Sequence, residues 1–360
     1  KNQIFSTIKK KDFILGKSVN EFEKRFSELS KIKYSVGCAS GTDALILSLM
    51  SLNLRKEDEI IVPGMSYIST GLSVILNNNK LIFVDIDNKT GLISIDKVAD
   101  KLTKKTKAII PVNLYGQKVD LKKLREVVGS KITIIEDSAQ SILAYSCHGC
   151  TNNNNSNKCC KKKMNEKYSD ISCYSFYPSK NLGAYGDAGL IATNDKKKYK
   201  KLLALRNLGA IKKNRFTLIG KNSRLDTIQS IVLKNKIKNV LKWNDVRRKI
   251  SNIYDKNLED INEVKLTKTF PGSSRHLYVI RVKNRKKLVK YLTKKKIPVQ
   301  FHYPYSLNKT GALKNKIKNI KLPISEQWAK ECISLPLHPK LKISDADYIA
   351  NQIRIFFKNK

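Results

Sequence analysis

The chain has 360 residues, of which 41 % are hydrophobic, and its 71 Lys and Arg against 30 Asp and Glu leave a formal net charge of +41. This length predicts one large domain and a smaller one. No apolar run comes near the roughly 20 residues that span a bilayer, and the first residues lack the apolar core of a signal peptide, which argues against a membrane or secreted protein.

Lysine accounts for most of the positive charge, and it is spread along the chain together with many Asn and Ile residues. This joint excess indicates an AT-rich genome, and a surface that binds nucleic acid or another polyanion is the alternative. We therefore expect a cytoplasmic protein with no nucleic-acid and no membrane partner. The dispersed charge can still attract an acidic substrate such as a nucleotide diphosphate.

Seven cysteines, an odd number without a secretory signal, argue against a disulfide framework and for a reducing compartment. Four of them lie between Cys147 and Cys160, and thiolates in such a cluster can bind zinc. The surrounding tract has low complexity and carries an asparagine run and a lysine run. We expect an inserted surface loop at about 146–167 and no metal site, with zinc binding by this loop as the alternative.

From Lys33 to Asp195, short apolar segments alternate with segments of helix length. The predicted strands are 59–64, 80–87, 107–114, 131–139, 171–178 and 189–194. The predicted helices are 42–54, 68–78 and 121–128. Continuous Val and Ile content without strict alternation is typical of strands buried on both faces. The prediction is an α/β fold whose large domain has a mostly parallel sheet flanked by helices.

Beyond residue 194 the composition becomes more helical and richer in lysine. A second unit is predicted from strand 275–282, helix 285–296, strand 297–304 and a C-terminal helix at 343–357. We place the boundary in a long helix near Val240, and expect a large domain at 1–240 and a smaller C-terminal α/β domain at 241–360.

Lys180 stands apart from the other lysines because of its setting. The apolar segment from Ile171 to Tyr177 ends at Pro178, and a turn with three glycines leads into the next apolar segment. A lysine held between such segments is a candidate buried amine, which loses its proton more easily and can attack a carbonyl. The alternative is one more solvated lysine.

Other candidate residues follow the carboxyl ends of predicted strands, where α/β sheets bind ligands. Gly41 and Thr42 begin a predicted helix and offer N–H groups and a hydroxyl to a phosphate, or serve as an ordinary helix start. Asp137 ends the strand TIIED, and Gln140 follows three residues later. The alternative for this carboxylate is a capping role.

Eight motifs in a single order resemble those of the DegT/DnrJ-type sugar aminotransferases, fold-type-I enzymes that use pyridoxal phosphate. The motifs are GCASGTDAL, IIVPGMSYIST, FVDID, PVNLYGQKVD, IIEDSAQ, SFYPSKNLGAYGDAG, GKNSRLDTIQS and FHYP. The resemblance covers nearly the whole chain, from Phe13 to the LPLHP segment near its end.

The resemblance implies how the cofactor ring is held. Lys180 would bind the cofactor covalently and, once released, would move the proton between substrate and cofactor. Asp137 would pair with the pyridine nitrogen and keep it protonated. Gln140 would contact the side of the phenolic oxygen, and Tyr67 would stack on the ring.

The resemblance also implies a phosphate site formed by Gly41, Thr42 and Ser175. In the family, the asparagine of the GxNSR motif reaches the phosphate of the neighbouring subunit, and in this chain it is Asn222. This implies a homodimer with composite active sites.

On the substrate side, His302 and Tyr303 of the FHYP motif would face the substrate, and Phe13 and Gly16 would contribute to a substrate pocket, either their own or that of the partner. The chain departs from the family at Leu208, where a histidine is frequent, and in the segment after FHYP. Both departures put individual substrate contacts in doubt.

The predicted reaction transfers an amino group from glutamate to a nucleotide-linked 4-keto-6-deoxyhexose, with UDP or dTDP, and gives a 4-amino-4,6-dideoxy sugar for glycan synthesis. The alternatives are a 3-keto sugar aminotransferase, a dehydratase of the same fold, and a non-catalytic basic protein that binds nucleic acid. Dehydratases of this fold have histidine in place of Lys180. The Lys, Asn and Ile bias resembles that of giant-virus proteins, for which the expected product is UDP-viosamine, a 4-amino-4,6-dideoxyglucose made in the host cytoplasm for virion glycans.

Overall fold

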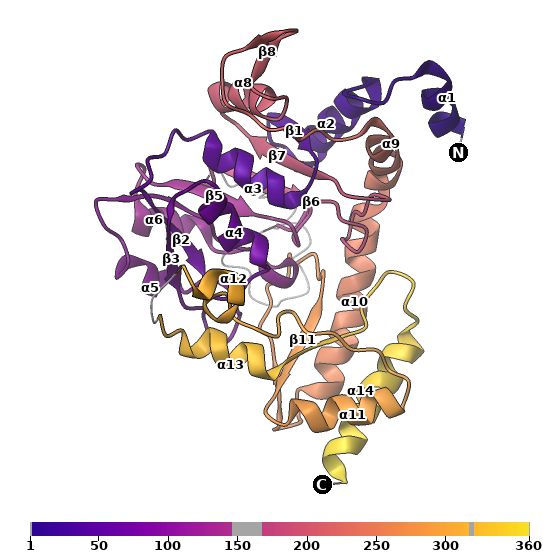
Figure 1. The fold of residues 1–360 in the computed structure, drawn as a ribbon. Helices are drawn as coiled ribbons and strands as arrows, with labels where there is room; N and C mark the ends of the chain where they lie inside the picture. Colours follow the sequence, from indigo (N-terminus) through magenta and orange to yellow (C-terminus); the bar gives the residue numbers. More distant parts are fainter. Residues whose placement is uncertain (1, 146–167, 317–319, 360) are drawn as a thin grey trace.

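The central feature of the fold is a seven-stranded sheet of order β1-β7-β6-β5-β4-β2-β3 (Figure 1). The structure is a computed structural model that describes residues 2–145, 168–316 and 320–359. The strands of the sheet are β1 (Tyr34–Cys38), β2 (Glu59–Pro63), β3 (Lys80–Val84), β4 (Thr106–Ile109), β5 (Thr133–Asp137), β6 (Ile171–Ser175) and β7 (Gly189–Thr193). Only β7 runs against its neighbours, and the other adjacent pairs are parallel. The predicted mostly parallel sheet is therefore confirmed, although β1 was not among the predicted strands.

Helices cover both faces of this sheet. They are α2 (Lys17–Ser30), α3 (Gly41–Met50), α4 (Ile68–Leu76), α5 (Ile95–Ala99), α6 (Leu121–Val128), α8 (Lys196–Leu205) and α9 (Thr227–Lys236), with a 3-10 turn at Leu114–Gly116. The N-terminal helix α1 (Asn2–Lys10) lies away from the sheet and contacts α9 (Figure 1). Successive residues of a strand enter different cores: Ile60 and Val62 pack with α3 and α4, whereas Ile61 packs with α5 and α6. Burial on both faces explains the continuous Val and Ile content of these strands.

A smaller antiparallel sheet, of order β10-β11-β12, forms the core of the C-terminal part. Its elements are α10 (Val240–Leu258), β10 (Val264–Leu266), β11 (Tyr278–Val282), α11 (Arg285–Lys294), β12 (Cys332–Leu335) and α14 (Ile343–Lys358), and a 3-10 turn at Ile237–Asn239 leads into α10. The prediction of a strand at 297–304 was wrong. That segment makes a single bridge, between Gln300 and Ser334, because Pro298 and Pro304 have no N–H to donate to a ladder.

The chain returns to the large sheet between the segment at 297–304 and β12. This connecting segment comprises a 3-10 turn at Leu307–Lys309, α12 (Gly311–Lys314) and α13 (Pro323–Glu331). Leu307 and Leu313 join the core under α3 and α4, and Trp328 joins the core of the opposite face. The Arg281 guanidinium of β11 lies 4.4 Å from the Trp328 ring centroid. The two sheets are therefore connected by packed side chains as well as by α10.

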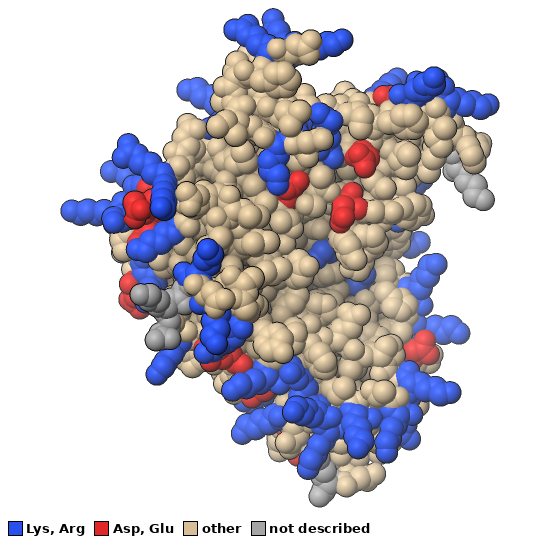
Figure 2. All heavy atoms as spheres, viewed as in Figure 1, with Lys and Arg blue, Asp and Glu red and all other residues tan. Residues whose placement is uncertain are grey.

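The charged side chains are dispersed. Figure 2 shows Lys and Arg spread around the periphery of one face, while a band through its centre carries few charges. This is the distribution expected from a compositional bias toward lysine. Among the residues described, no helix is both long and apolar enough to cross a membrane, and no cluster of three or more His, Cys, Asp or Glu could hold a metal ion. The cysteine-rich tract at 146–167 lies outside the described residues.

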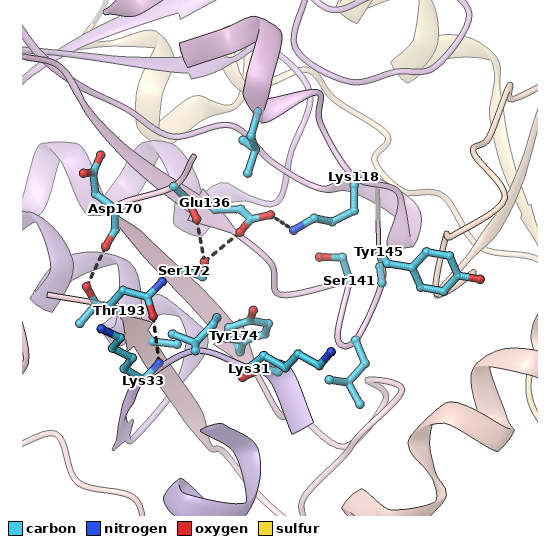
Figure 3. A pocket seen from close by; sticks show the side chains of 18 of the residues that line it. Lys31, Lys33, Lys118, Glu136, Ser141, Tyr145, Asp170, Ser172, Tyr174 and Thr193 are labelled. Carbon is cyan, nitrogen blue, oxygen red and sulfur yellow. Dashed lines mark hydrogen bonds and ion pairs between the residues drawn. The ribbon is translucent and has the colours of Figure 1, made fainter. Parts of the chain in front are cut away.

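A cavity of about 640 Å³ lies on the face of the sheet that carries α2 and α6 (Figure 3). Glu136, Ser172 and Tyr174 line it from β5 and β6. Glu136 is already engaged, because its carboxylate accepts from Ser172 Oγ at 2.8 Å and pairs with Lys118. Side chains alternate along a strand, so this cavity lies across the sheet from Asp137.

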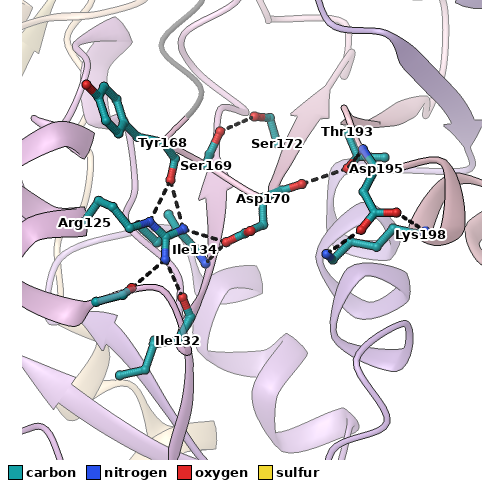
Figure 4. A network of polar contacts seen from close by, with 11 residues as sticks. Arg125, Ile132, Ile134, Tyr168, Ser169, Asp170, Ser172, Thr193, Asp195 and Lys198 are labelled. Carbon is teal, nitrogen blue, oxygen red and sulfur yellow. Dashed lines mark hydrogen bonds and ion pairs between the residues drawn. The ribbon is translucent and has the colours of Figure 1, made fainter.

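Arg125 at the end of α6 holds the start of β6 in place (Figure 4). Its guanidinium donates to the carbonyl oxygens of Gly129, Ile132 and Tyr168 and, at 2.7 Å, to Asp170 Oδ2. The same Asp170 oxygen accepts from the amide of Ile134. One side chain thus ties α6 to β5 and β6, the two strands that carry Asp137 and Ser175.

We expect Arg125→Ala to lower the free energy of unfolding by about 2 kcal/mol, because several part-buried acceptors lose a charged donor. Lys123→Ala, on the same helix, is the matched control. Its ion pair with Asp96 is 2.7 Å long but its side chains are 52 % and 82 % exposed, so the cost is expected to stay below about 0.5 kcal/mol. Denaturant titration measures both values, and equal effects of the two substitutions would contradict the role of Arg125.

Candidate active site

The predicted cofactor residues lie at one edge of the large sheet. β1, β2, β5 and β6 run in the same direction, so their carboxyl ends and the loops that follow meet at that edge. The residues concerned are Gly41 and Thr42 after β1, Tyr67 after β2, Asp137 and Gln140 at and after β5, and Ser175 and Lys180 at and after β6.

Lys180 sits in a tight turn that follows β6. Its amide donates to Tyr177 O at 2.9 Å, and the amide of Ala184 donates to Phe176 O at 2.8 Å. A Cβ on Gly183 would lie 2.3 Å from Pro178 O, so only glycine allows the turn to close this tightly. The Lys180 side chain is half-buried, and burial lowers the pKa of its amine to about 8, although the charge of Asp137 opposes this shift.

Asp137 is the last residue of β5, and its carboxylate is buried. Oδ2 accepts from Thr70 Oγ1 at 2.9 Å, and Oδ1 accepts from the amide of Ala139 at 3.1 Å. Burial raises the pKa of Asp137 even though these two hydrogen bonds and the positive charge of Lys180 lower it. The two hydrogen bonds and the charge of Lys180 therefore do not offset the burial of this carboxylate, and a closer cationic partner would.

Thr70 and Ser69 of α4 are site residues that sequence reasoning missed. Thr70 donates to Asp137, and Ser69 Oγ lies 2.7 Å from Thr42 Oγ1. Both belong to the YIST motif, whose tyrosine, Tyr67, we predicted as a cofactor residue. In a helix, the residue three positions after Tyr67 lies on the same face as Tyr67. That spacing was the available signal for Thr70.

The start of α3 forms a cradle for an anion. A Cβ on Gly41 would lie 2.6 Å from Ser175 Cβ, so glycine lets the helix start approach β6 closely. Ser40 Oγ caps the amide of Asp43 at 3.1 Å. The amides of Gly41 and Thr42 precede it and have no acceptor within the helix, and the hydroxyls of Thr42, Ser69 and Ser175 lie beside them. Backbone donors and a positive helix end suit a phosphate group.

Residues from the C-terminal part reach the same edge. Gln140 Nε2 donates to Tyr303 Oη at 2.8 Å, and the Tyr303 ring centroid lies 5.8 Å from that of Tyr67. Burial and the charge of Lys180 lower the pKa of His302 to about 4, and its Nδ1 lies 2.7 Å from Ser334 Oγ. The structure thus brings Tyr303, Tyr67 and Gln140 together across the two sheets.

Phe13, Gly16 and Asn222 have their contacts elsewhere. The Phe13 carbonyl accepts from the amide of Thr227, and the amide of Gly16 donates to Thr227 Oγ1 at 3.2 Å. Asn222 is exposed and forms a bridge with Asn207. Within one chain, these three residues belong to the region of α9 and the β8–β9 hairpin (Ala210–Lys212 and Arg215–Phe216) and not to the group around Lys180.

A lysine amine with a lowered pKa, a buried carboxylate at a strand end and a phosphate cradle at a helix start together define a pyridoxal phosphate enzyme on a parallel sheet. Comparison with known proteins identifies the family, because the sequence model of the DegT/DnrJ/EryC1/StrS aminotransferase family matches residues 1–354. The chain belongs to this family.

Two relatives show the extent of the similarity. The chain is 34 % identical over 336 residues to the UDP-2-acetamido-2-deoxy-3-oxo-D-glucuronate aminotransferase of Pseudomonas aeruginosa, covering 91 % of this chain and 88 % of the relative. It is 33 % identical over 346 residues to the dTDP-3-amino-3,6-dideoxy-alpha-D-galactopyranose transaminase of Aneurinibacillus thermoaerophilus, covering 95 % and 90 %.

Solved structures agree with this assignment. S. venezuelae DesV superimposes with a TM-score of 0.91 at 29 % identity, over 99 % of this chain and 93 % of that chain. NtdA from Bacillus subtilis, solved with bound cofactor PMP, has a TM-score of 0.89 at 27 % identity, over 99 % and 81 %. The predicted fold, the predicted aminotransferase class and the predicted pyridoxal phosphate cofactor are confirmed.

The residues of this chain fit that cofactor. The raised pKa of Asp137 reflects a carboxylate whose two hydrogen bonds do not offset its burial, and a protonated pyridine nitrogen is the missing cation. The close approach of Gly41 to Ser175 places the Ser175 hydroxyl beside the first turn of α3, where both would bind the phosphate. Lys180, with a pKa of about 8, reaches its neutral form under mild conditions.

We expect Lys180 in the cofactor-free protein to react with an amine-acylating reagent with a midpoint near pH 8, the pKa to which burial lowers it. Ordinary surface lysines follow a midpoint near about pH 10.4. Since Asp137 holds the pKa of Lys180 up, Asp137→Asn should move the midpoint to lower pH. Peptide mapping by mass spectrometry measures both curves, with exposed Lys123 as internal control, and a Lys180 curve that coincides with that of Lys123 would contradict the buried amine.

Proposed function

We propose that this aminotransferase moves an amino group from glutamate to a keto carbon of a nucleotide-linked deoxy sugar. The observation that carries the proposal is the position of Lys180 in the turn after β6, next to the strand β5 that ends at Asp137. Burial lowers the pKa of the Lys180 amine and raises the pKa of the Asp137 carboxyl, while the charge of each opposes the shift of the other. Named relatives at 33 % and 34 % identity act on dTDP and UDP sugars, which supports a nucleotide sugar as the acceptor.

The residues at the sheet edge then have distinct tasks. When bound, pyridoxal phosphate supplies an electron sink and a carrier for the amino group. Lys180 holds the cofactor through Nζ and, as a free neutral amine, takes and returns the proton at the substrate carbon. Asp137 would keep a positive charge at the pyridine nitrogen, and the start of α3 with Ser175 would bind the phosphate. Tyr67 and Gln140 orient the ring, with Tyr303 closing the site from the C-terminal part.

The position of amination has two candidates. From the sequence we expect a UDP- or dTDP-4-keto-6-deoxyhexose as acceptor and a 4-amino-4,6-dideoxy product, of which UDP-viosamine is one. The names of several relatives instead specify 3-oxo, 3-dehydro or 3-amino sugars, and a 3-keto sugar is therefore the second candidate acceptor. A dehydratase is disfavoured, because the resemblance assigns histidine to such enzymes where this chain has Lys180.

We expect the purified protein to bind pyridoxal phosphate with a visible absorption band that glutamate abolishes, and to add one amino group to a nucleotide keto sugar. Product masses from a panel of UDP- and dTDP-linked 3-keto and 4-keto deoxyhexoses identify the acceptor. Lys180→Ala should lose the band and reduce turnover by at least about 1,000-fold while remaining folded. A band that glutamate leaves unchanged in the wild type would overturn the proposal.

Asn222 supports a homodimer with composite sites. It is exposed in the segment that follows β9. Apolar side chains close to it in the sequence are exposed as well: Ile211 at 51 %, Phe216 at 59 % and Ile219 at 91 %. Large apolar side chains exposed together mark an interaction surface. In a symmetric dimer the same surface of each chain contacts the other, and Asn222 would contact the phosphate bound by the partner.

Subunit complementation tests this dimer. Lys180→Ala and Asn222→Ala homodimers should both be weakly active, but dissociating and reassociating an equal mixture should restore about a quarter of wild-type activity, because half of the dimers then carry one intact site. Mixing Lys180→Ala with Lys180→Arg is the matched control and should restore nothing. If the first mixture stays as inactive as its components, Asn222 does not act across an interface.

A further inference from the structure

Asn181, the residue directly after Lys180, is buried and fully engaged. Its Nδ2 lies 2.8 Å from Asn244 Oδ1 and 2.8 Å from Ser274 O. Its Oδ1 lies 3.0 Å from Nδ1 of His276. The turn that carries the reactive lysine is therefore held by three contacts from the C-terminal part of the chain.

Two backbone carbonyls determine which atoms of this cluster donate. Ile142 O can only accept, so the Asn244 group facing it at 3.1 Å is Nδ2, and Asn244 Oδ1 faces Asn181. Ser274 O also can only accept, so the Asn181 amide nitrogen faces both of these oxygens. Asn181 Oδ1 is left for His276, and an amide oxygen only accepts. His276 Nδ1 must therefore carry a proton.

The His276 ring is neutral in this setting. It is 7 % exposed, and burial, together with the positive charges of Lys180 and Arg247, holds its pKa well below the usual value. A neutral ring with a proton on Nδ1 has none on Nε2. The effect of Lys180 on this pKa also means that the ring lies within electrostatic reach of the amine.

The segment that contains His276 also contacts the cofactor loop after β5. Ser274 Oγ donates to Gln140 O at 3.0 Å, and the amide of Ser274 donates to Gly116 O at 2.8 Å. The segment thus bonds both to the turn of Lys180 and to the backbone of Gln140. The position of this segment therefore determines how the turn of Lys180 and the backbone of Gln140 lie relative to each other.

We propose that His276 is a positioning residue, whose Nδ1–H donates to Asn181 Oδ1 and thereby holds the turn that aims Lys180 at the reacting carbon. The inference rests on the proposed function, since it assigns His276 a task only if Lys180 is the catalytic amine. His276 does not touch the reacting atoms, and its contribution is the orientation of Lys180. Misplacing a reacting group by about 1 Å can cost about 100-fold in rate.

The tautomer can be measured directly. The chain has four histidines, so a sample labelled with 15N-histidine gives few signals, and His276→Asn identifies the one that disappears. We expect the His276 signal to show a neutral ring protonated at Nδ1 from pH 5.5 to 8.5 in the cofactor-loaded protein. A ring protonated at Nε2 alone, or one that titrates in this range, overturns the proposal. This measurement does not depend on turnover.

Two variants separate positioning from packing. An Asn side chain places its amide nitrogen near the site of Nδ1, whereas Gln places it near Nε2. His276→Asn should keep kcat of the glutamate half-reaction within about threefold, and His276→Gln should lower it about 10- to 100-fold with KM little changed. The exposed His338, changed to Asn and to Gln, is the matched control and should leave both constants unchanged.

Cofactor content and thermal unfolding of each variant are measured alongside, so that a lost cofactor is not read as a lost orientation. Equal kcat values for His276→Gln and His276→Asn, at equal cofactor content, overturn the proposal. If His276→Gln does not fold, the tautomer of the wild type decides the question. If wild-type protein shows no glutamate-driven loss of the visible band, the proposed function fails instead, and the hydrogen bond to Asn181 is still tested by the tautomer.

Discussion

The active site depends on two opposite charges kept away from water. Asp137 and Lys180 come from adjacent parallel strands, and burial shifts the pKa of each toward its neutral form while the attraction between them opposes both shifts. A protonated ring nitrogen near Asp137 would offset the burial of its carboxylate, and Lys180 would hold the cofactor through Nζ. One ligand that pairs with the carboxylate and binds the amine would therefore offset the cost of burying both charges.

The surrounding structure maintains that burial. The sheet is covered on both faces, so the strand ends are held by cores that include Ile60, Ile61 and Ile135. The glycine turn after β6 brings Lys180 back over the sheet edge, and Arg125 anchors the start of the same strand. Movement of β5 against β6 would expose the two charges to water.

The C-terminal part completes the site from the other side. Tyr303 reaches Gln140, the Tyr115 hydroxyl donates to His302 O at 2.5 Å, and the cluster around Asn181 joins the lysine turn to α10. These contacts make the second sheet part of the catalytic framework. The departures from the family pattern, Leu208 and the segment after FHYP, fall on the substrate side, whereas the cofactor side retains its motifs.

Local patterns in the sequence were enough for six of the seven strands of the large sheet and for α3, α4 and α6, and they selected the proposed cofactor residues Gly41, Tyr67, Asp137, Ser175 and Lys180 at the edge of that sheet. A buried parallel strand has a recognisable composition, and residues after such strands meet at one edge. The same reasoning overlooked β1 and assigned a strand to 297–304, because short edge segments are decided by their pairing partners.

Contacts between distant segments could not be predicted in this way. Thr70 beside Asp137, Tyr303 over Gln140 and His276 on Asn181 join residues separated by 67, 163 and 95 positions. The sequence by itself determined which side chains we propose for the chemistry, since those residues lie in local motifs. Only the tertiary structure decided which groups orient them and how far their pKa values move, because burial and hydrogen bonding depend on what the rest of the chain packs around them.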